Sequence, residues 1–363
     1  MDNFGLWQFG DGLNFDKMLA IFTKMCYNLL VRRSDGRENY LWERKFMKIV
    51  VLDGYAVNPG DLSWEFLEKY GEVFVYDKTP DADCAEKCKN AEVVFTNRAK
   101  ITAEILDACP TIKYVSALGT GYDMIDISAC EKRMVKVVNI PDYSAASVAQ
   151  LTIQFLISLY SDLDGISNIV KEGKWTGIPG YRYDFVRYGE LAGGVLGLIG
   201  CGSIGRRVAA IASALGMEVL AWTPNAHSDT ETVKFVGLSE LLSRADVISF
   251  HCPLNEKTRG MVNADFLSKT KHGVKLINTS RGAVFNESDV ADALRSGRVS
   301  AAAVDVLAVE PALRENPLLS APNCIITPHI AWATKAARMR LLDVIDRSLA
   351  SYVSGEGGIN RIC

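Results

Sequence analysis

VLGLIGCGSIGRRVA (195–209) runs from a short apolar stretch into a stretch with helical spacing, and three glycines lie at the junction. They make the pattern G-x-G-x-x-G and are Gly200, Gly202 and Gly205. The first allows a tight turn, the second lets the backbone approach a pyrophosphate, and the third lets the helix pack on the strand. The amides of Ser203 and Ile204 would then face an anion at the helix start. Between a strand and a helix, this pattern predicts dinucleotide binding; a glycine-rich packing turn is the alternative.

Short β-branched runs alternate with helical stretches on both sides of this motif. Before it, strands are expected at 48–53, 72–77, 92–97, 112–117 and 135–140. From the motif onward, strands are expected at 195–200, 218–222, 233–236, 246–251, 274–278, 300–305 and 324–328. Such alternation is typical of parallel sheets with helices on both faces. The sequence therefore predicts an α/β protein with two doubly wound parallel-sheet domains.

Two long helices are expected around the second series of strands. One spans 144–172 and is too apolar for a solvated surface helix, which makes it a candidate bridge between domains and a candidate dimer contact. The other spans 333–354 and has apolar residues at helical spacing. An aromatic, glycine-rich segment at 174–191 is expected to form a loop that packs on another surface.

The first 46 residues differ from the rest of the chain. Residues 16–33 have helical apolar spacing, but Lys24 interrupts them and a charged stretch follows. They lack the basic start and cleavage site of a signal peptide, and they are too short and too charged to span a bilayer. The segment is either an amphipathic arm or an extension from a misplaced start codon, and we favour the extension, with Met47 as the true beginning.

The composition narrows the class of protein. With 363 residues, of which 48% are hydrophobic and 23% charged, the chain can form two globular domains. Its net charge of -3 provides no basic surface for nucleic acid. The nine cysteines are scattered without a paired metal-binding spacing, so we expect no metal site, and reduced thiols in a cytoplasmic protein.

Four polar residues follow strand ends, where ligands bind in open α/β sheets. They are Arg281 in INTSRG, Asp305 and Glu310 in AVDVLAVEP, and His329 in TPHIAW. Taken singly, Arg281 could be a surface residue, Glu310 a turn residue and His329 a core histidine. Together, on successive strand ends that face a dinucleotide motif, they favour a functional site, because the alternative needs three coincidences.

From about residue 47 to 360, the chain resembles the D-isomer-specific 2-hydroxyacid dehydrogenase family. The resemblance is carried, in order, by GLIGCGSIG, HCPLNEKTRGMVN, INTSRGAVFNESDVADAL, AAAVDVLAVEP and NCIITPHIAWAT. MKIVVLDGYAVNPGDLSW, VSALGTGYDMID and HIAWAT are most similar to glycerate dehydrogenases, also called hydroxypyruvate reductases. The family resemblance implies a flavodoxin-like substrate domain (47–146 and 331–363), a Rossmann NAD(P)-binding domain (147–330) and a homodimer.

The resemblance also implies a role for each residue of the site. Arg281 would clamp the carboxylate and carbonyl oxygen of a small 2-keto acid, which suits a planar cation. His329 would give its proton to that oxygen as the nicotinamide delivers hydride, while Glu310 orients the imidazole and favours its charged form. Trp332 would cap the substrate pocket or pack against the last helix. Backbone donors in the first domain would hold the carboxylate; the residues of this turn are Leu118, Gly119, Thr120 and Gly121.

The expected cofactor is NAD, with NADP as the alternative. Thr223 occupies the place where an acidic residue usually binds the adenosine ribose, and no arginine follows it to bind a 2′-phosphate. The resemblance implies that Asp305 holds the nicotinamide carboxamide. The other implied cofactor contacts are Cys252, Pro253, Thr258, Thr279 and Ser280.

The substrate is expected to be unphosphorylated. Phosphoglycerate dehydrogenases of the family have an arginine where this chain has Thr96, and Arg98 and Lys100 are shifted from that position. This favours hydroxypyruvate or glyoxylate over 3-phosphoglycerate, with D-lactate as a further alternative. Formate dehydrogenases of this fold have a glutamine in place of Glu310. A rival from another class is an NAD(H)-sensing, corepressor-like binding protein, which can keep the same three polar residues.

Overall fold

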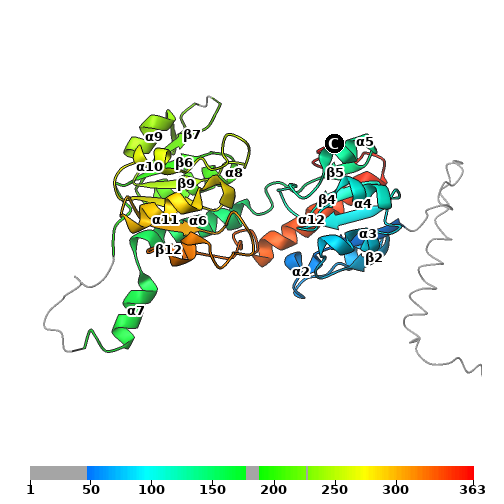
Figure 1. Cartoon of the computed structure of the whole chain (residues 1–363), viewed down its shortest axis with the longest axis horizontal. Coiled ribbons are helices and arrows are strands. Elements are labelled where there is room, and N and C mark those ends of the chain that lie inside the picture. Colours follow the sequence, from blue (N-terminus) through cyan, green and yellow to red (C-terminus); the bar gives the residue numbers. More distant parts are fainter. Residues whose placement is uncertain (1–46, 177–187, 226–227) are drawn as a thin grey trace, which may run out of the picture. The chain divides into compact units, whose positions relative to one another are not determined.

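A computed structural model of the chain describes residues 47–176, 188–225 and 228–363 and contains two parallel sheets (Figure 1). The expected helix within 16–33 and most of the aromatic loop expected at 174–191 lie outside the described residues. Within the described ranges, no helix is long and apolar enough to cross a membrane.

The first sheet has five parallel strands in the order β2-β1-β3-β4-β5. Its strands are β1 (Met47–Leu52), β2 (Gly71–Val75), β3 (Val93–Thr96), β4 (Tyr114–Ala117) and β5 (Lys136–Val138). The helices between them are α2 (Gly54–Val57), α3 (Cys84–Lys87), α4 (Ala103–Ala108) and α5 (Ile127–Lys132). This strand order is that of flavodoxin-like sheets, which confirms the architecture expected for the first half.

The second sheet has seven parallel strands in the order β12-β11-β10-β9-β6-β7-β8. Its strands are β6 (Val195–Ile199), β7 (Glu218–Trp222), β8 (Lys234–Phe235), β9 (Val247–Phe250), β10 (Val274–Asn278), β11 (Val299–Val304) and β12 (Cys324–Ile326). The helices are α8 (Ser203–Ala214), α9 (Leu238–Arg244), α10 (Ala264–Ser268) and α11 (Glu287–Arg295). The order reverses at β6, between β7 and β9, and a Rossmann sheet binds its ligand at the carboxyl ends beside this point.

The strands are apolar because both faces of each sheet are covered. In β1, Val50 and Leu52 belong to one buried cluster, whereas Ile49 and Val51 belong to another. Successive side chains of a strand point to opposite faces, so the two clusters lie on the two faces of the first sheet. Two further clusters divide the second sheet in the same way.

Two long helices connect or follow the sheets. Helix α6 (Ala145–Tyr160) packs through Ile153 and Leu156 into an apolar cluster of the second sheet. Helix α12 (Lys335–Val353) packs through Leu341 and Ile345 into a cluster of the first sheet. The chain therefore leaves the first sheet after β5 and returns to it after β12.

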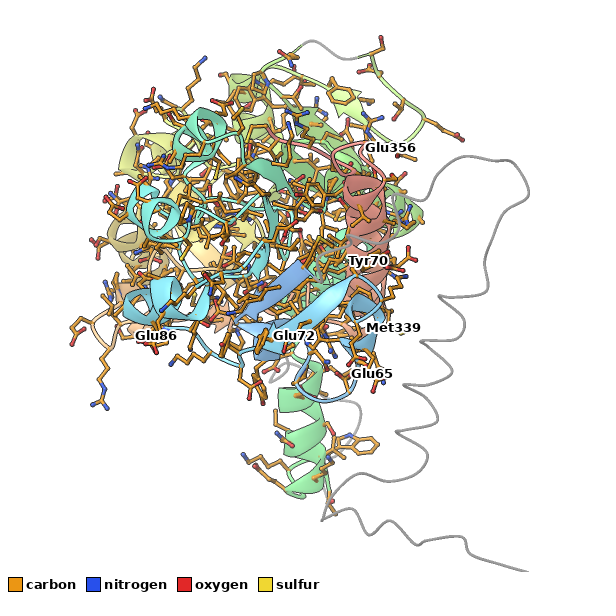
Figure 2. All side chains as sticks on the ribbon, turned by 90° about the vertical axis from the view of Figure 1, so that its right-hand side faces the viewer. Glu65, Tyr70, Glu72, Glu86, Met339 and Glu356 are labelled. Carbon is orange, nitrogen blue, oxygen red and sulfur yellow. The ribbon has the colours of Figure 1, made fainter. Side chains whose placement is uncertain are left out.

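Polar contacts also hold α12 against the first sheet. The hydroxyl of Tyr70, labelled in Figure 2, donates to Asp346 Oδ1 at 2.8 Å. The guanidinium of the buried Arg338 donates to both carboxylate oxygens of Asp61, at 2.6 and 2.9 Å. Paired guanidinium contacts of this kind set orientation as well as energy, so they define how the last helix lies on the sheet.

The single helix expected at 144–172 is wrong, because the structure divides it into α6 and α7 (Leu163–Lys171). Ser161 has an extended backbone, and the carboxylate of Asp162 accepts a hydrogen bond from the amide of Gly165. An aspartate in this position caps a new helix. The cap therefore starts a second helix that the apolar pattern alone did not reveal.

Candidate active site

The three glycines of the dinucleotide motif have different surroundings. Gly200 has a φ of 93°, and a Cβ there would lie 2.6 Å from the carbonyl oxygen of His251. A Cβ on Gly205 would lie 2.7 Å from the Gly200 oxygen, so the start of α8 packs directly on the turn. A Cβ on Gly202 would meet nothing within 4 Å. The space beside Gly202 is therefore open, although its backbone conformation does not demand glycine.

That open space lies at the start of α8. Gly202 is the N-cap, so no side chain satisfies the first amides of the helix. Free amides and the helix dipole together favour an anion at this position, and the residues fit the pyrophosphate of a dinucleotide. The hydroxyl of Ser203 donates to Asp142 Oδ1 at 2.5 Å, so this residue contacts the segment that links β5 to α6.

The residue that follows β7 is Thr223. Its hydroxyl donates to the carbonyl oxygen of Asn225 at 2.7 Å, within the same turn. No carboxylate is supplied at this strand end by Thr223, Pro224 or Asn225. The described start of this turn therefore presents no charged side chain.

The loop after β9 carries Cys252, Pro253 and Thr258. The Thr258 hydroxyl donates to the carbonyl oxygen of Pro253 at 2.7 Å and accepts from the amide of Asn255 at 2.8 Å. Burial raises the pKa of the Cys252 thiol to about 11. These hydrogen bonds close the turn between Pro253 and Thr258, and the Cys252 thiol is protonated near neutral pH.

His251 precedes this loop and differs from His329 in its surroundings. Burial lowers the pKa of His251 to about 4, so its imidazole is neutral near pH 7. Its Nε2 lies 2.9 Å from the Ser249 hydroxyl, and its buried Nδ1 has no hydrogen-bond partner among the described residues. A histidine held neutral in this way is a poor proton donor.

Thr279 and Ser280 precede Arg281 at the end of β10. The hydroxyl of Thr279 lies 3.0 Å from that of Thr152 in α6, and both are buried. The amide and hydroxyl of Ser280 donate to Asn278 Oδ1 at 3.0 and 2.9 Å. Asn278 also donates to the carbonyl oxygen of Arg281 at 3.0 Å. Asn278 therefore determines the turn from which Arg281 projects.

Arg281 meets the glycine turn of the first sheet. Its Nη1 donates to the Ser280 carbonyl oxygen at 2.9 Å, and its Nε lies 3.9 Å from Asp123 Oδ2. Its Nη2 lies against Gly121, where a Cβ would collide with it. The structure thus brings together the expected guanidinium and one residue of the expected carboxylate-binding turn.

The rest of that turn follows β4. Leu118 is buried, and its amide donates to the Thr96 carbonyl oxygen at 2.7 Å. The Thr120 hydroxyl donates to the carbonyl oxygen of Ile140 at 2.9 Å, and the Ile140 amide donates to the Gly119 oxygen at 2.9 Å. The turn is therefore anchored to the segment that leaves β5.

His329 and Glu310 form a close pair. His329 Nδ1 lies 2.6 Å from Glu310 Oε2, and Glu310 Oε1 accepts from the Leu307 amide at 3.1 Å. Burial acts to raise the pKa of Glu310, but the hydrogen bond and charge of His329, the Leu307 amide and Arg98 outweigh it and lower the pKa. The ionised carboxylate therefore faces Nδ1, which leaves Nε2 as the ring nitrogen available to a substrate.

Asp305 holds the loop that carries this histidine. It is buried at the end of β11; its Oδ1 accepts from the Thr327 hydroxyl at 2.5 Å and from the Ile330 amide at 2.9 Å. Its Oδ2 accepts from the Ala331 amide at 2.8 Å. These bonds surround His329, whose φ of 56° is uncommon for a residue with a side chain.

Trp332 is half-buried and packs against the apolar cluster shared by the first sheet and α12. This is the packing role that the sequence left as one of two alternatives. Its contact with a substrate stays a prediction. Within the described ranges, no group of His, Cys, Asp and Glu side chains could hold a metal ion.

Two residues near the site were not assigned roles from the sequence. Arg98 Nη2 lies 3.5 Å from Glu310 Oε2, although Arg98 follows β3 of the other sheet. The hydroxyl of Tyr143 would lie 3.8 Å from a Cβ on Gly119, and burial raises its pKa. The position of Arg98 after a strand end is a sequence signal for a site residue. Lys100 has the same signal but pairs with Asp81, so the signal alone does not distinguish the two cations.

The chain is similar to known proteins along most of its length. Residues 153–331 match the model of the D-isomer specific 2-hydroxyacid dehydrogenase NAD binding domain. The chain is 44% identical over 314 residues to a hydroxypyruvate reductase of Blautia hydrogenotrophica, a match that covers 85% of this chain and 98% of the relative. It is 33% identical over 312 residues to a glycerate dehydrogenase of Methylorubrum extorquens, covering 85% of this chain and 97% of the relative.

A solved structure extends the likeness to the fold. The chain aligns with a D-lactate dehydrogenase of Aquifex aeolicus, complexed with NAD and lactic acid, at a TM-score of 0.72 and 28% identity. That alignment covers 86% of this chain and 98% of the other. Given these matches over nearly the whole length of each relative, the chain belongs to the D-isomer specific 2-hydroxyacid dehydrogenase family.

Proposed function

We propose that this protein reduces a small 2-keto acid, hydroxypyruvate or glyoxylate, to the 2-hydroxy acid, which is D-glycerate when the substrate is hydroxypyruvate. The reverse oxidation uses the same residues. The observation that carries the proposal is the 2.6 Å pair of His329 Nδ1 and Glu310 Oε2, which prepares one imidazole nitrogen for proton transfer. The contact of Arg281 with the Gly121 turn supports a carboxylate site beside it.

Each residue has one task in the proposed reaction. Arg281 binds the carboxylate and carbonyl oxygen, and the amides of the Gly119–Gly121 turn bind the carboxylate. The nicotinamide, when bound, supplies hydride to the carbonyl carbon. His329 Nε2 gives its proton to the carbonyl oxygen, and the Glu310 carboxylate stabilises the imidazolium until then. The 2-keto acid gains one hydride and one proton, which makes the hydroxyl.

We propose NAD as the cofactor, bound along the carboxyl ends of the second sheet. The open space at Gly202 and the uncapped amides of α8 support the pyrophosphate position. The neutral turn at Thr223 does not repel a 2′-phosphate, so NADPH belongs in the same test. The other proposed contacts are Ser203, Ile204, Cys252, Pro253, Thr258, Thr279, Ser280 and Asp305.

The residue at the end of β3 supports a small, unphosphorylated substrate. Thr96 is buried and donates to the carbonyl oxygen of Ala99 at 2.6 Å, so this position offers no charge to a phosphate. Trp332 would limit the size of the acid from the side of α12. The substrate is therefore proposed to carry one carboxylate and a short side chain.

The test is cofactor oxidation with a panel of acids. The purified protein is mixed with NADH or NADPH and with hydroxypyruvate, glyoxylate, pyruvate or 3-phosphohydroxypyruvate, and absorbance at the nicotinamide band is followed. We expect the highest kcat/KM with hydroxypyruvate or glyoxylate. Preference for 3-phosphohydroxypyruvate or pyruvate would assign the alternative substrates. Cofactor binding without oxidation of any acid would favour the binding-protein alternative.

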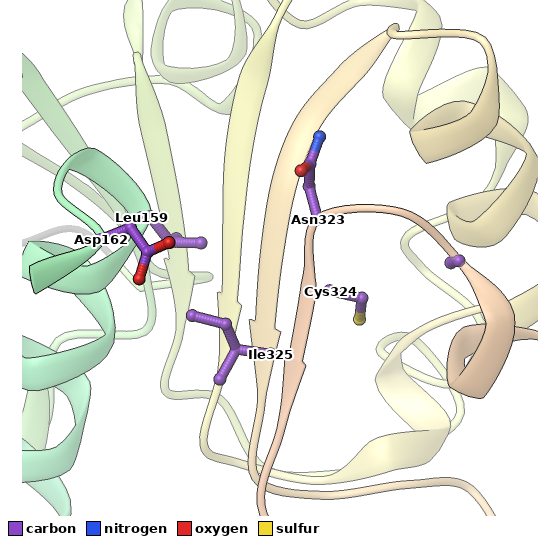
Figure 3. A pocket seen from close by; sticks show the side chains of 6 residues that line it. Leu159, Asp162, Asn323, Cys324 and Ile325 are labelled. Carbon is purple, nitrogen blue, oxygen red and sulfur yellow. The ribbon is translucent and has the colours of Figure 1, made fainter. Parts of the chain in front are cut away.

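We also propose a homodimer formed around α7. This helix has no buried residue, and its first residue, Leu163, is 72% exposed. Tyr188, which pairs with Ser161 just before the helix, is 79% exposed. A hollow of about 390 Å³ lies next to it at the amino end of β12, lined in part by Leu159, Asp162 and Ile325 (Figure 3). Adjacent apolar side chains and a hollow support contact with a second copy.

The dimer is tested by sedimentation of Leu163→Lys. We expect wild-type protein to sediment as a dimer and the variant to dissociate. Met134→Lys is the control, because Met134 is 82% exposed but belongs to the first sheet's loops. A wild-type monomer would contradict the proposal.

The two sheets correspond to two proposed domains, and the cysteines bear on the cellular compartment. We propose a substrate domain of 47–146 and 331–363 and a cofactor domain of 147–330, supported by the packing of α12 and α6 on different sheets. The described cysteines are free, which supports a reducing compartment such as the cytoplasm.

A further inference from the structure

Arg98 reaches the acid–base pair from the other sheet. Its Nη2 lies 3.5 Å from Glu310 Oε2, the same oxygen that lies 2.6 Å from His329 Nδ1. The Arg98 side chain is 54% exposed and that of Glu310 is 24% exposed, so the contact lies at the edge of the site. One carboxylate oxygen therefore faces two cationic partners when the imidazole is protonated.

The backbone that carries Arg98 is firmly held. The buried carboxylate of Asp53 accepts from the amides of Arg98 and Ala99 at 3.0 and 2.7 Å, and from the amide of Thr79 at 2.8 Å. The Thr96 hydroxyl closes the same turn on Ala99. The backbone of this turn is therefore held in place, and the Arg98 side chain extends from it to Glu310.

We propose that Arg98 is a positioning residue of the reaction: it acts through Glu310 to weaken the hold of the carboxylate on the His329 imidazolium and so promotes proton donation to the substrate. The inference rests on the proposed function. A guanidinium close to the carboxylate offsets part of its negative charge, and the imidazolium is then stabilised less. Among the described residues, the Arg98 side chain makes no hydrogen bond with the imidazole or with the carboxylate-binding turn.

The other charged groups around the pair have different tasks. Asp305, at the end of β11, accepts the His329 amide through its carbonyl oxygen at 2.8 Å, while its carboxylate binds the loop. Arg281, after β10, contacts the Gly121 turn. Among the described residues, Arg98 is thus the cation whose contact with Glu310 can change how strongly this carboxylate stabilises the His329 imidazolium.

The proposal predicts a direction for the pH dependence. Without Arg98, the carboxylate keeps the imidazole protonated to higher pH. The alkaline limb of kcat/KM for reduction should therefore move upward, and so should the acidic limb for oxidation, which needs the neutral ring. Because the contact is half-exposed, we expect a displacement of about half a pH unit.

The experiment compares Arg98→Met, Arg98→Lys and Lys100→Met. Profiles of kcat/KM against pH are measured in both directions at fixed ionic strength. Arg98→Met should displace both limbs upward, and Arg98→Lys should restore most of the wild-type profile because it keeps the charge. Lys100→Met is the matched control: Lys100 is a neighbouring cation that pairs with Asp81 at 2.9 Å, and its profile should be unchanged.

A second readout separates this inference from the proposed function. The chain has four histidines, so their imidazole NMR signals can be followed during a pH titration of the NADH-bound protein, with His329→Asn identifying the relevant signal. Arg98→Met should displace the His329 titration upward even if the substrate is a different acid. If no acid is reduced, the proposed function fails while this titration still tests Arg98.

Three results would overturn the inference. An undisplaced profile and titration in Arg98→Met would show that the charge does not reach the pair. A raised KM with undisplaced limbs would make Arg98 a direct substrate ligand. An equal displacement in Lys100→Met would show a general effect of net charge, with no specific contact.

Discussion

The main-chain amide of His329 donates to the carbonyl oxygen of Asp305 at 2.8 Å, and the Asp305 carboxylate binds the two residues that follow the histidine. The end of β11 therefore determines where the imidazole lies. A loop fixed by a buried carboxylate can keep His329 in a left-handed conformation that costs free energy when unsupported.

Asp305→Asn should weaken this support. The side-chain amide keeps one accepting oxygen, but its NH2 group then faces the main-chain amide of Ile330 or of Ala331, because each carboxylate oxygen accepts from one of them. We expect unfolding free energy to fall by about 1–3 kcal/mol, because a buried hydrogen-bonding group loses its partner, and kcat to fall with it. Urea denaturation and steady-state kinetics measure both, with the exposed Asp292→Asn as the control. Equal stability in the two variants would contradict the role of the carboxylate.

His329→Asn should lose most turnover while cofactor binding survives. A positioned general acid contributes about 10²–10⁴ in rate, so kcat should fall within that range. The NADH dissociation constant, measured by fluorescence, should stay near the wild-type value. His272→Asn changes an exposed histidine elsewhere and should alter neither quantity. Full turnover in His329→Asn would remove the proton-transfer role.

Gly202→Ala and Gly205→Ala should separate binding from folding. The Cβ of Gly202→Ala meets nothing within 4 Å in the protein alone, so the thermal midpoint should change little while the NADH dissociation constant rises. The Cβ of Gly205→Ala lies 2.7 Å from a carbonyl oxygen, so the midpoint should fall. Calorimetry and fluorescence titration test the pair. Unchanged NADH affinity in Gly202→Ala would argue against the pyrophosphate position.

Thr223→Asp should raise the preference for NADH over NADPH. A carboxylate after β7 can accept hydrogen bonds from the ribose hydroxyls and repels a 2′-phosphate. The ratio of kcat/KM values for the two cofactors should increase at least several-fold. Thr230→Asp, beyond the turn, serves as a control for added charge. A ratio that does not change would show that the ribose lies elsewhere.

Acid should remove the stabilisation that Glu310 provides. The pKa of Glu310 is lowered in the folded protein, so its contribution is present above the unfolded value of 4.5 and is lost as pH falls through the folded pKa. The difference in unfolding free energy between the wild type and Glu310→Gln should therefore shrink as the pH is lowered from 6 toward this range. A difference that grew on acidification would contradict this sign.

Local chemistry explains why many expectations were confirmed. The β-branched runs form the strands of two parallel sheets. Their side chains are apolar on both faces, and such strands are stable only where helices cover both faces of the sheet. Two glycines of the dinucleotide motif, Gly200 and Gly205, are constrained by neighbouring backbone atoms, whereas Gly202 leaves open space. The expectation of a continuous helix at 144–172 was wrong at Asp162. Its side chain caps a new helix there, although the apolar pattern continues on both sides of it.

By itself, the sequence determined the strand positions, the dinucleotide turn and the candidates Arg281, Glu310 and His329, because these depend on short-range pattern and residue chemistry. The tertiary structure decided which charges meet. Arg98 faces Glu310 while Lys100 faces Asp81, although the two cations are separated by one residue. Coulomb interactions depend on distances between groups that are far apart in the chain, and only the folded backbone determines those distances.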